Sequence, residues 1–237
     1  WGEQVDRAVR AARLSMGEVG DCRHDEVIFT SGGSESDNLA LRGVLWAARA
    51  DKRGNHFITT AIEHPAVLET ARSLATEHGF ELTILPVNET GQVTPEQVGA
   101  ALRPDTVLVS VIWGNNEIGS LNPIAEIGAL CRQRGVLFHT DAVQAAGQLE
   151  PDVSALQVDL MSLGAHKFYG PKGVGALFVR QGVALQTNQT GGSQERNRRA
   201  GTLNVPLIVG MAAALRFSAE QRAARSLHAK LMRNRLI

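Results

Sequence analysis

The sequence lacks the features of several protein classes. No apolar run in its 237 residues approaches the roughly 20 residues of a membrane-spanning helix, and we expect no signal peptide. Its 24 acidic residues balance its 24 basic residues, and the net charge of zero argues against binding to nucleic acids or membrane surfaces through gross charge. The two cysteines, Cys22 and Cys131, are far apart and in no metal-binding spacing. We therefore expect a reducing, cytoplasmic setting without a disulfide framework.

Apolar runs with the composition of strands alternate with helical patterns along the chain. We expect strands at residues 26–31, 56–61, 80–87, 106–113, 136–142, 158–163 and 175–180, and helices at 34–49, 65–79, 94–103 and 123–135. Thr94 is placed to cap one of these helices, with Pro95 at its first position. The alternation predicts an α/β protein with a mostly parallel sheet and helices on both faces.

Polar residues that could bind a ligand follow the predicted strands. Ligands in such sheets bind beyond the carboxyl ends of the strands, so these residues should meet in one cleft. The clusters are Ser31–Ser34, His64, Asn115–Glu117, Asp141–Gln144 and His166–Lys167.

The segment TSGGSES, residues 30–36, joins a strand to a helix and is suited to holding phosphate. Gly32 and Gly33 let the backbone present its N–H groups, the helix start adds partial positive charge, and Ser34 can cap the helix. A plain capped turn is the alternative interpretation. The segment is neither a P-loop nor a Rossmann fingerprint.

Further polar positions allow a structural as well as a functional interpretation. Asp141 directly follows an apolar strand, where a buried carboxylate needs a partner such as a protonated ring nitrogen. The His139–Asp141 spacing could serve a metal ion, but no convincing third ligand lies nearby in the sequence. His64 lies at the predicted ligand edge, and the amides of Asn115 and Asn116 either contact a ligand or form a turn.

Lysine is scarce, with four residues in the chain, and two of them share the glycine-rich stretch SLGAHKFYGPKG at residues 162–173. Apolar surroundings would lower the pKa of Lys167, and its neutral amine could then form a Schiff base with a carbonyl group. Lys172 lies in a GPKG turn, which we expect to point away into solvent. A phosphate cradle, a buried acid and a Schiff-base lysine are the parts of a pyridoxal phosphate site.

Six segments in order resemble the cysteine desulfurases of iron–sulfur and thio-cofactor assembly. That family belongs to the class V group within the aspartate-aminotransferase fold of pyridoxal-phosphate enzymes. The segments are TSGGSESDNLAL, EHPAV, NNEIG, HTDAVQ, AHKFYGPKGVGALFVR and GGSQERNRRAGTLNV. The resemblance covers nearly the whole chain.

The resemblance implies a role for each candidate residue around the cofactor ring. Lys167 would carry pyridoxal 5'-phosphate as a Schiff base, and Asp141 would pair with the pyridine nitrogen. Gln144 would hydrogen-bond the phenolic oxygen, and His64 would stack over the ring and help to move protons.

The resemblance also implies a phosphate site and a shared dimer site. Gly33 and Ser34 would hold the phosphate, with His166 beside them. Asn116 would contact the substrate or the cofactor oxygen. Thr202 would reach the phosphate of a partner subunit's cofactor, because the family forms homodimers with shared sites.

The implied reaction removes sulfur from L-cysteine, giving L-alanine and an enzyme persulfide. The sulfur would pass to an acceptor protein such as an iron–sulfur scaffold. The alternatives are another class V enzyme, such as a selenocysteine or cystine lyase or an aminotransferase, and a catalytically incomplete cofactor-binding domain. A metal hydrolase built around His139 and Asp141 lacks ligands.

The sequence departs from the family pattern in two respects. Gly164 stands where the family commonly has a phosphate-binding serine, a loss for which Ser162 or backbone N–H groups could compensate. No cysteine follows Lys167, although the family's persulfide cysteine lies well beyond its lysine. Cys131 fits an apolar helix face with Ile124 and Ile127, and Cys22 is expected to be structural or exposed.

Neither end of the chain carries a clear boundary signal. The sequence opens at Trp1 within a helical pattern and closes at Ile237 within a basic amphipathic pattern. We expect a piece of a longer protein that lacks the small domain. Residues 1–15 would be the remnant of an N-terminal helix, 16–215 the cofactor-binding large domain, and 216–237 the start of a connection.

Overall fold

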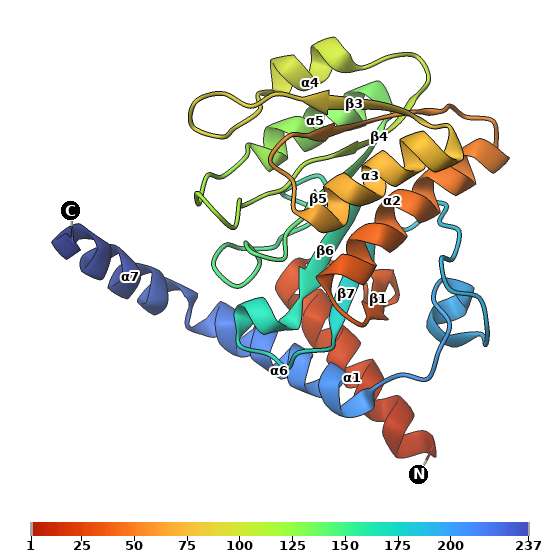
Figure 1. The fold of residues 1–237 in the computed structure, drawn as a ribbon. Helices are drawn as coiled ribbons and strands as arrows, with labels where there is room; N and C mark the ends of the chain where they lie inside the picture. The colour runs from red at the N-terminus through yellow and green to blue at the C-terminus, as the bar shows by residue number, and fades with distance from the viewer. Residues whose placement is uncertain (1, 237) are drawn as a thin grey trace.

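A seven-stranded sheet lies at the centre of the protein in the computed structural model, which describes residues 2–236 (Figure 1). The strand order is β1-β7-β6-β5-β4-β2-β3, and β7 is antiparallel to both of its neighbours while the other pairs are parallel. The strands are β1 (Val27–Thr30), β2 (His56–Thr60), β3 (Glu81–Leu85), β4 (Thr106–Ser110), β5 (Leu137–Asp141), β6 (Leu160–Gly164) and β7 (Gly175–Val179). The expected mostly parallel sheet is confirmed.

Helices cover both faces of this sheet. They are α1 (Gly2–Gly20), α2 (Gly33–Ala50), α3 (Pro65–His78), α4 (Pro95–Ala101), α5 (Ile124–Arg134), α6 (Val205–Glu220) and α7 (Arg222–Leu236), with short 3-10 helices η1 (His24–Glu26), η2 (Ala165–Phe168) and η3 (Gln194–Asn197). Helix α1 runs to Gly20, past the boundary at residue 15 expected for the N-terminal helix. Thr94 caps α4 as expected, since its hydroxyl accepts a hydrogen bond from the Gln97 amide.

Successive strand residues supply two hydrophobic cores, one on each face of the sheet. Phe57 and Leu108 pack with the apolar residues of α2 and α3. Ile58 and Val109 point to the opposite face and pack with residues of α1, α5 and α6. Side chains alternate between the faces of a strand, so a strand with helices on both sides is apolar throughout. This burial explains the nearly continuous apolar run at residues 106–113.

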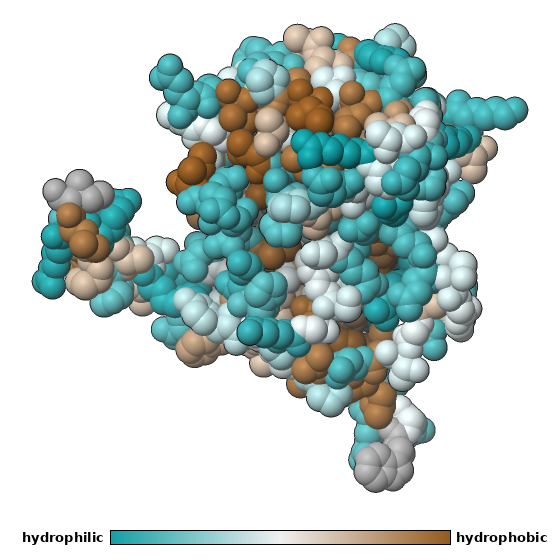
Figure 2. Space-filling view, viewed as in Figure 1, coloured by the Kyte–Doolittle hydropathy of each residue, from teal (hydrophilic) through white to brown (hydrophobic). Residues whose placement is uncertain are grey.

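The last helix, α7, stands away from the body of the protein, and none of its described residues is buried (Figures 1 and 2). Its apolar side chains are exposed among basic ones, as at Leu227 and Leu231. Of the helices within residues 2–236, none is both long and apolar enough to cross a membrane.

A buried ion pair fastens the segment after β7 to the start of the sheet. The Arg13 guanidinium on α1 pairs with the Glu195 carboxylate in η3 and also donates to the Val27 carbonyl oxygen. The other Glu195 oxygen accepts a hydrogen bond of 2.8 Å from the Phe29 amide. Arg13 also lies over the Phe29 ring, 4.6 Å from its centroid. The pair therefore joins α1, β1 and η3.

We predict that Glu195→Ala destabilises the protein by about 3–5 kcal/mol, because it leaves the Arg13 charge buried without its partner. Urea unfolding followed by circular dichroism measures this loss. The matched control is Glu18→Ala, which breaks the exposed Arg216–Glu18 pair and should cost less than about 1 kcal/mol. Equal small losses in the two variants would contradict the prediction.

Candidate functional site

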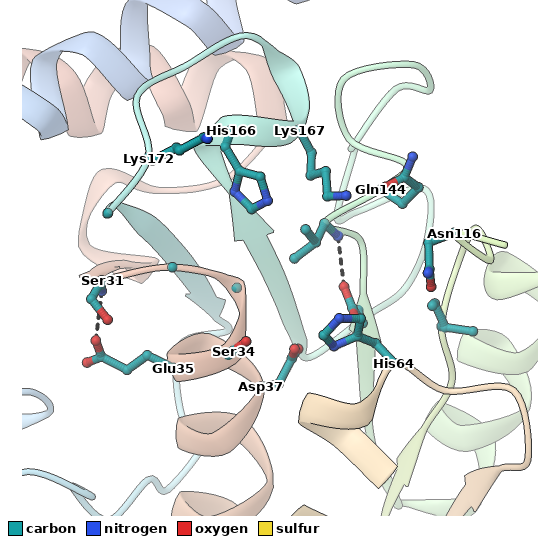
Figure 3. A pocket seen from close by; sticks show the side chains of 16 residues that line it. Ser31, Ser34, Glu35, Asp37, His64, Asn116, Gln144, His166, Lys167 and Lys172 are labelled. Carbon is teal, nitrogen blue, oxygen red and sulfur yellow. Dashed lines mark hydrogen bonds between the residues drawn. The ribbon is translucent and has the colours of Figure 1, made fainter. Parts of the chain in front are cut away.

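A cavity of about 570 Å³ lies at the carboxyl ends of the parallel strands (Figure 3). Each of the polar clusters predicted from the sequence contributes to its wall, so their convergence is confirmed. The lining residues are Ser31, Gly32, Gly33, Ser34, Glu35, Asp37, His64, Ile112, Asn116, Asp141, Val143, Gln144, His166, Lys167, Lys172 and Gly173.

The first turn of α2 forms one wall of the cavity with unpaired backbone N–H groups. Gly32 occupies the N-cap position, so the expectation that Ser34 caps the helix is wrong: Ser34 lies inside the first turn. The amides of Gly33 and Ser34 have no hydrogen-bond partner within residues 2–236. A side chain at position 33 would place its Cβ 2.6 Å from Cγ2 of Val143, so glycine is required for this close approach. The turn is suited to binding an anionic group.

An ion pair holds this turn against the segment after β7. The Glu35 carboxylate accepts a hydrogen bond of 2.7 Å from the Ser31 amide and one of 2.7 Å from Nε of Arg199. Partial burial opposes ionisation of Glu35, but the hydrogen bonds from Arg199 and Ser31 hold its pKa below the ordinary value. Arg199 thus compensates an ionised carboxylate beside the anion-binding turn.

Asp141 is the buried acid predicted from the sequence, and it ends β5. It is 4 % exposed, and its carboxylate accepts a hydrogen bond of 2.9 Å from the Val143 amide. Burial raises the pKa of Asp141, whereas the Val143 N–H, His64 and Lys167 act to lower it. One polar atom each of Asp141, His64 and Asp37 lies within 4.8 Å of the others. A cation beside Asp141 would favour its charged form.

His64 closes the cavity next to Asp141 and is also the N-cap of α3. Its Nδ1 accepts a hydrogen bond of 3.1 Å from the Ala66 amide. In the neutral ring the proton therefore sits on Nε2, because the acceptor nitrogen carries none. The capping hydrogen bond therefore determines which tautomer of the neutral His64 ring is present in the cavity.

Lys167 and His166 extend into the cavity from η2, opposite Asp37 and His64 (Figure 3). Lys167 is exposed to the cavity, so the expectation that apolar surroundings enclose it is wrong. The expectation that Lys172 points away is also wrong, since this exposed lysine lines the same cavity. Burial and the charges of Lys167 and Lys172 lower the pKa of His166, which favours its neutral form at neutral pH.

The remaining predicted residues divide between the cavity and other places. Asn116 and Gln144 line the cavity. The neighbouring Asn115 is buried, and its amide donates to the Ile62 carbonyl oxygen at 2.9 Å, so it shapes the loop. Thr202 is exposed and does not line this cavity.

His139 is a structural residue, and the hypothesis of a metal site built on it is wrong. Its Nδ1 lies 2.8 Å from the Ser110 hydroxyl and its Nε2 lies 3.0 Å from the Ser162 hydroxyl, so both ring nitrogens have partners. Burial lowers the pKa of His139 to about 3, which leaves the ring neutral. Ser162 is fully buried in this contact, so its hydroxyl does not replace the serine missing at position 164.

Two buried acids near the cavity were not found from the sequence. Asp37 is 1 % exposed and lines the cavity one helical turn after Gly33. This spacing placed it on the same helix face as the anion-binding turn and could have indicated it. Glu63 is 6 % exposed and precedes His64; its Oε1 accepts hydrogen bonds from the Thr60 hydroxyl and the Ile112 amide. Burial raises the pKa of Glu63 to about 8.

Neither cysteine is suited to act as a nucleophile. Cys131 is fully buried and packs in the same core as Ile124 and Ile127, as expected from the sequence. Cys22 is half-buried and packs against that core. Burial raises the pKa of each thiol to about 12, so the reactive thiolate is scarce at neutral pH.

The cavity combines donors for an anion with a buried acid for a cation. The free amides of α2 lie on the same side as His166 and Lys172 (Figure 3). Asp37 and Asp141 are buried acids that line the cavity, and His64, Lys167 and the Val143 N–H favour the charged form of Asp141. These residues fit a ligand that carries a phosphate group, a cationic ring nitrogen and a carbonyl carbon within reach of an amine.

Comparisons with known proteins agree with this chemistry. The family model for aminotransferase class V matches residues 1–235. A cysteine desulfurase IscS of Clostridium botulinum is 46 % identical over the whole chain, which spans 59 % of that relative's length. The crystal structure of DndA from Streptomyces lividans has a TM-score of 0.93 and 39 % identity, and the match covers 99 % of this chain and 67 % of that one. SspA in complex with cysteine has a TM-score of 0.86 and 38 % identity, covering 90 % and 61 %.

We predict that Glu63→Gln flattens the pH dependence of stability. The folded state raises the Glu63 pKa from 4.5 to about 8, so it binds this proton more tightly than the unfolded state does. The free energy of unfolding of the wild-type protein should therefore fall as pH rises between these values. Glutamine stays neutral, so the variant should gain stability relative to the wild type, on the order of a few kcal/mol by pH 8.

Urea unfolding at several pH values from 5 to about 8.5, without added ligand, measures this difference. The control is Glu89→Gln, because Glu89 is exposed in a loop. A difference between Glu63→Gln and wild type that stays constant with pH would show that Glu63 does not hold its proton in the folded state.

Proposed function

Because the chain belongs to the class V aminotransferase family, we propose that the protein is a pyridoxal-phosphate-dependent cysteine desulfurase that converts L-cysteine to L-alanine and an enzyme persulfide. The observation that carries the proposal is the meeting of Lys167, Asp141 and the α2 turn in one cavity. The relative named cysteine desulfurase and the structure of SspA with bound cysteine support this substrate.

Pyridoxal 5'-phosphate, the cofactor of this family, supplies an electron sink for bonds to the carbon that carries the substrate amine. The Gly33 and Ser34 amides, the Ser34 hydroxyl and His166 are the groups that would bind its phosphate. The Asp141 carboxylate would pair with the ring nitrogen of the cofactor, and Gln144 would donate a hydrogen bond to the phenolic oxygen. Asn116, at the opposite side of the cavity from the α2 turn, would contact the substrate or that oxygen.

Lys167 and His64 are the groups we assign to proton movement. The Lys167 side chain reaches into the cavity, which places its Nζ where it would exchange a proton with a substrate atom. The Nε2 proton of His64 faces away from the capping bond to Ala66 and is available for transfer. The His64 ring would also stack over the cofactor.

The sulfur-accepting thiol is assigned to sequence outside residues 1–237. Cys22 and Cys131 are thiols with a pKa of about 12, and the chain spans 59 % of the length of the relative from Clostridium botulinum. The division into a helix remnant at 1–15, a cofactor-binding domain at 16–215 and a connection at 216–237 stays part of the proposal, although its boundaries fall within α1, which ends at Gly20, and α6, which ends at Glu220. The two free cysteines support a reducing, cytoplasmic setting.

The proposal includes a homodimer and an acceptor protein. Thr202 is exposed on the segment after β7, outside its own subunit's cavity, which leaves it free to reach a partner's phosphate. The Arg13–Glu195 and Glu35–Arg199 pairs fix this segment on the body of the subunit. An iron–sulfur scaffold is the kind of acceptor that would take up the persulfide sulfur.

We predict that borohydride reduction of the full-length protein with pyridoxal phosphate attaches the cofactor to Lys167. Peptide mass spectrometry locates the modified residue. Lys167→Ala should lose the attachment and reduce alanine formation from L-cysteine at least about 100-fold. The matched control for attachment is Lys172→Ala, which removes the other lysine of the cavity and should leave Lys167 modified.

The outcomes separate the possible activities. Alanine together with sulfane sulfur supports a desulfurase, whereas alanine without sulfane sulfur contradicts the persulfide route. A full-length protein that binds no pyridoxal phosphate would overturn the proposed function altogether.

We predict that Gly164→Ser tightens cofactor binding. A Cβ at this position would lie 3.5 Å from the Gly33 amide nitrogen and 3.1 Å from Cγ1 of Val143, so a serine hydroxyl would reach the anion-binding turn after a small shift of Val143. One added hydrogen bond to phosphate should lower the dissociation constant about two- to tenfold, measured by cofactor absorbance. Gly164→Ala fills the same space without a donor, and equal affinity in the two variants would refute the idea.

A further inference from the structure

Asp37 is the buried polar group of the cavity to which the proposed function gives no role. It comes from the second turn of α2, is 1 % exposed, and lines the cavity with its carboxyl group directed inward (Figure 3). Its Oδ1 has no hydrogen-bond partner within residues 2–236. A buried carboxylate oxygen without a partner is costly, so the protonation state of Asp37 needs a physical cause.

Among the described residues, no cation compensates Asp37 from the elements packed around it. His139 on β5 lies 3.7 Å from its Oδ1, but this ring is neutral and both of its nitrogens have hydroxyl partners. Asp141, also on β5, and Glu63 after β2 are acids. His64 shares the cluster, and Lys167 faces the cavity from η2. The group nearest to Asp37 that must carry negative charge in the proposed function is Asp141.

We propose that Asp37 is a positioning residue that stays protonated, so that the Asp37–Asp141 pair carries a single negative charge and this charge resides on Asp141. The inference rests on the proposed function, in which an ionised Asp141 pairs with the ring nitrogen of the cofactor. It explains why Asp141 rather than Asp37 carries the charge. Their oxygen atoms lie within 4.8 Å, a distance at which like charges in a buried site strongly oppose double ionisation.

The neighbours of each acid decide which of the two keeps the proton. Asp141 accepts a hydrogen bond from the Val143 amide and faces His64 and Lys167, all of which favour its charged form. Asp37 is also buried, and burial and the neighbouring Asp141 charge raise its pKa, although the Ser162 hydroxyl acts to lower it. Protons in such a pair are lost in two steps that belong to the pair as a whole, and the proposal places the proton that remains after the first step on Asp37.

The test is infrared spectroscopy of the cofactor-free, full-length protein, in which a neutral carboxyl group has its own C=O stretching band. Glu63 also holds a proton in this region, so all variants carry Glu63→Gln. At pH 7 the difference spectrum between Glu63→Gln and Glu63→Gln/Asp37→Asn should contain a neutral-carboxyl band. Adding Asp141→Asn to Glu63→Gln removes the negative charge beside Asp37. The titration midpoint of the neutral-carboxyl band should then move to lower pH by about one unit or more.

A second measurement follows bound pyridoxal phosphate by its absorbance. The amide introduced by Asp37→Asn is neutral like the protonated acid, so cofactor affinity and the absorbance midpoint with pH should match those of the wild type within about threefold and 0.3 units. Asp37→Ala removes the polar group and is the matched comparison for packing. Circular dichroism checks folding, and Asp37→Ser replaces the asparagine variant if that one does not fold.

The outcomes distinguish this inference from the proposed function. A missing neutral-carboxyl band at pH 7, or a lowered absorbance midpoint in Asp37→Asn, means that Asp37 is ionised and overturns the inference while the function stands. A band that does not respond to Asp141→Asn overturns the coupling of the two acids. A wild-type protein that fails to bind pyridoxal phosphate overturns the proposed function, whereas the infrared result on cofactor-free protein still decides the state of Asp37.

Discussion

The site depends on keeping a carboxylate ionised in a buried position at the end of β5. Asp141 is almost inaccessible to water, and burial alone would favour its neutral acid. The Val143 amide, His64 and Lys167 act against that tendency from three different parts of the chain. A cationic ligand between these groups would complete the compensation, which is why the cavity suits a protonated ring nitrogen. The negative charge of Asp141 also raises the pKa of the neighbouring acids Asp37 and Glu63.

The sheet brings these groups together by a simple geometric rule. The parallel strands are buried on both faces, so polar groups can meet only where the strands end. Because the parallel strands share one direction, the segments after β1, β2, β4, β5 and β6 reach the same edge. Antiparallel β7 begins at that edge instead, and this topology places Lys172, which precedes it, beside the cavity.

Ion pairs on the other side of the cavity make a second connection. Glu35 binds the Ser31 amide and Arg199 together, so the anion-binding turn and the segment after β7 are held in one arrangement. The buried Arg13–Glu195 pair fixes the same segment to α1 and β1. A segment held this firmly can present an exposed residue such as Thr202 at a constant position. In the proposed homodimer, that rigidity would serve the partner's site.

The sequence alone determined the order of the seven strands and of helices α1 to α5 along the chain, the class of fold and the main ligand-facing clusters, but it did not indicate α6. These features depend on apolar periodicity and on glycine, proline and polar residues at element ends, which are local properties. Only the tertiary structure decided that Gly32 rather than Ser34 caps α2, that Lys167 is open to the cavity, that Lys172 joins it, and that His139 and Ser162 bind each other. It also revealed Asp37 and Glu63 as buried acids. The burial and charge of a side chain are set by residues far away in the chain, and no local pattern records which of them it will meet.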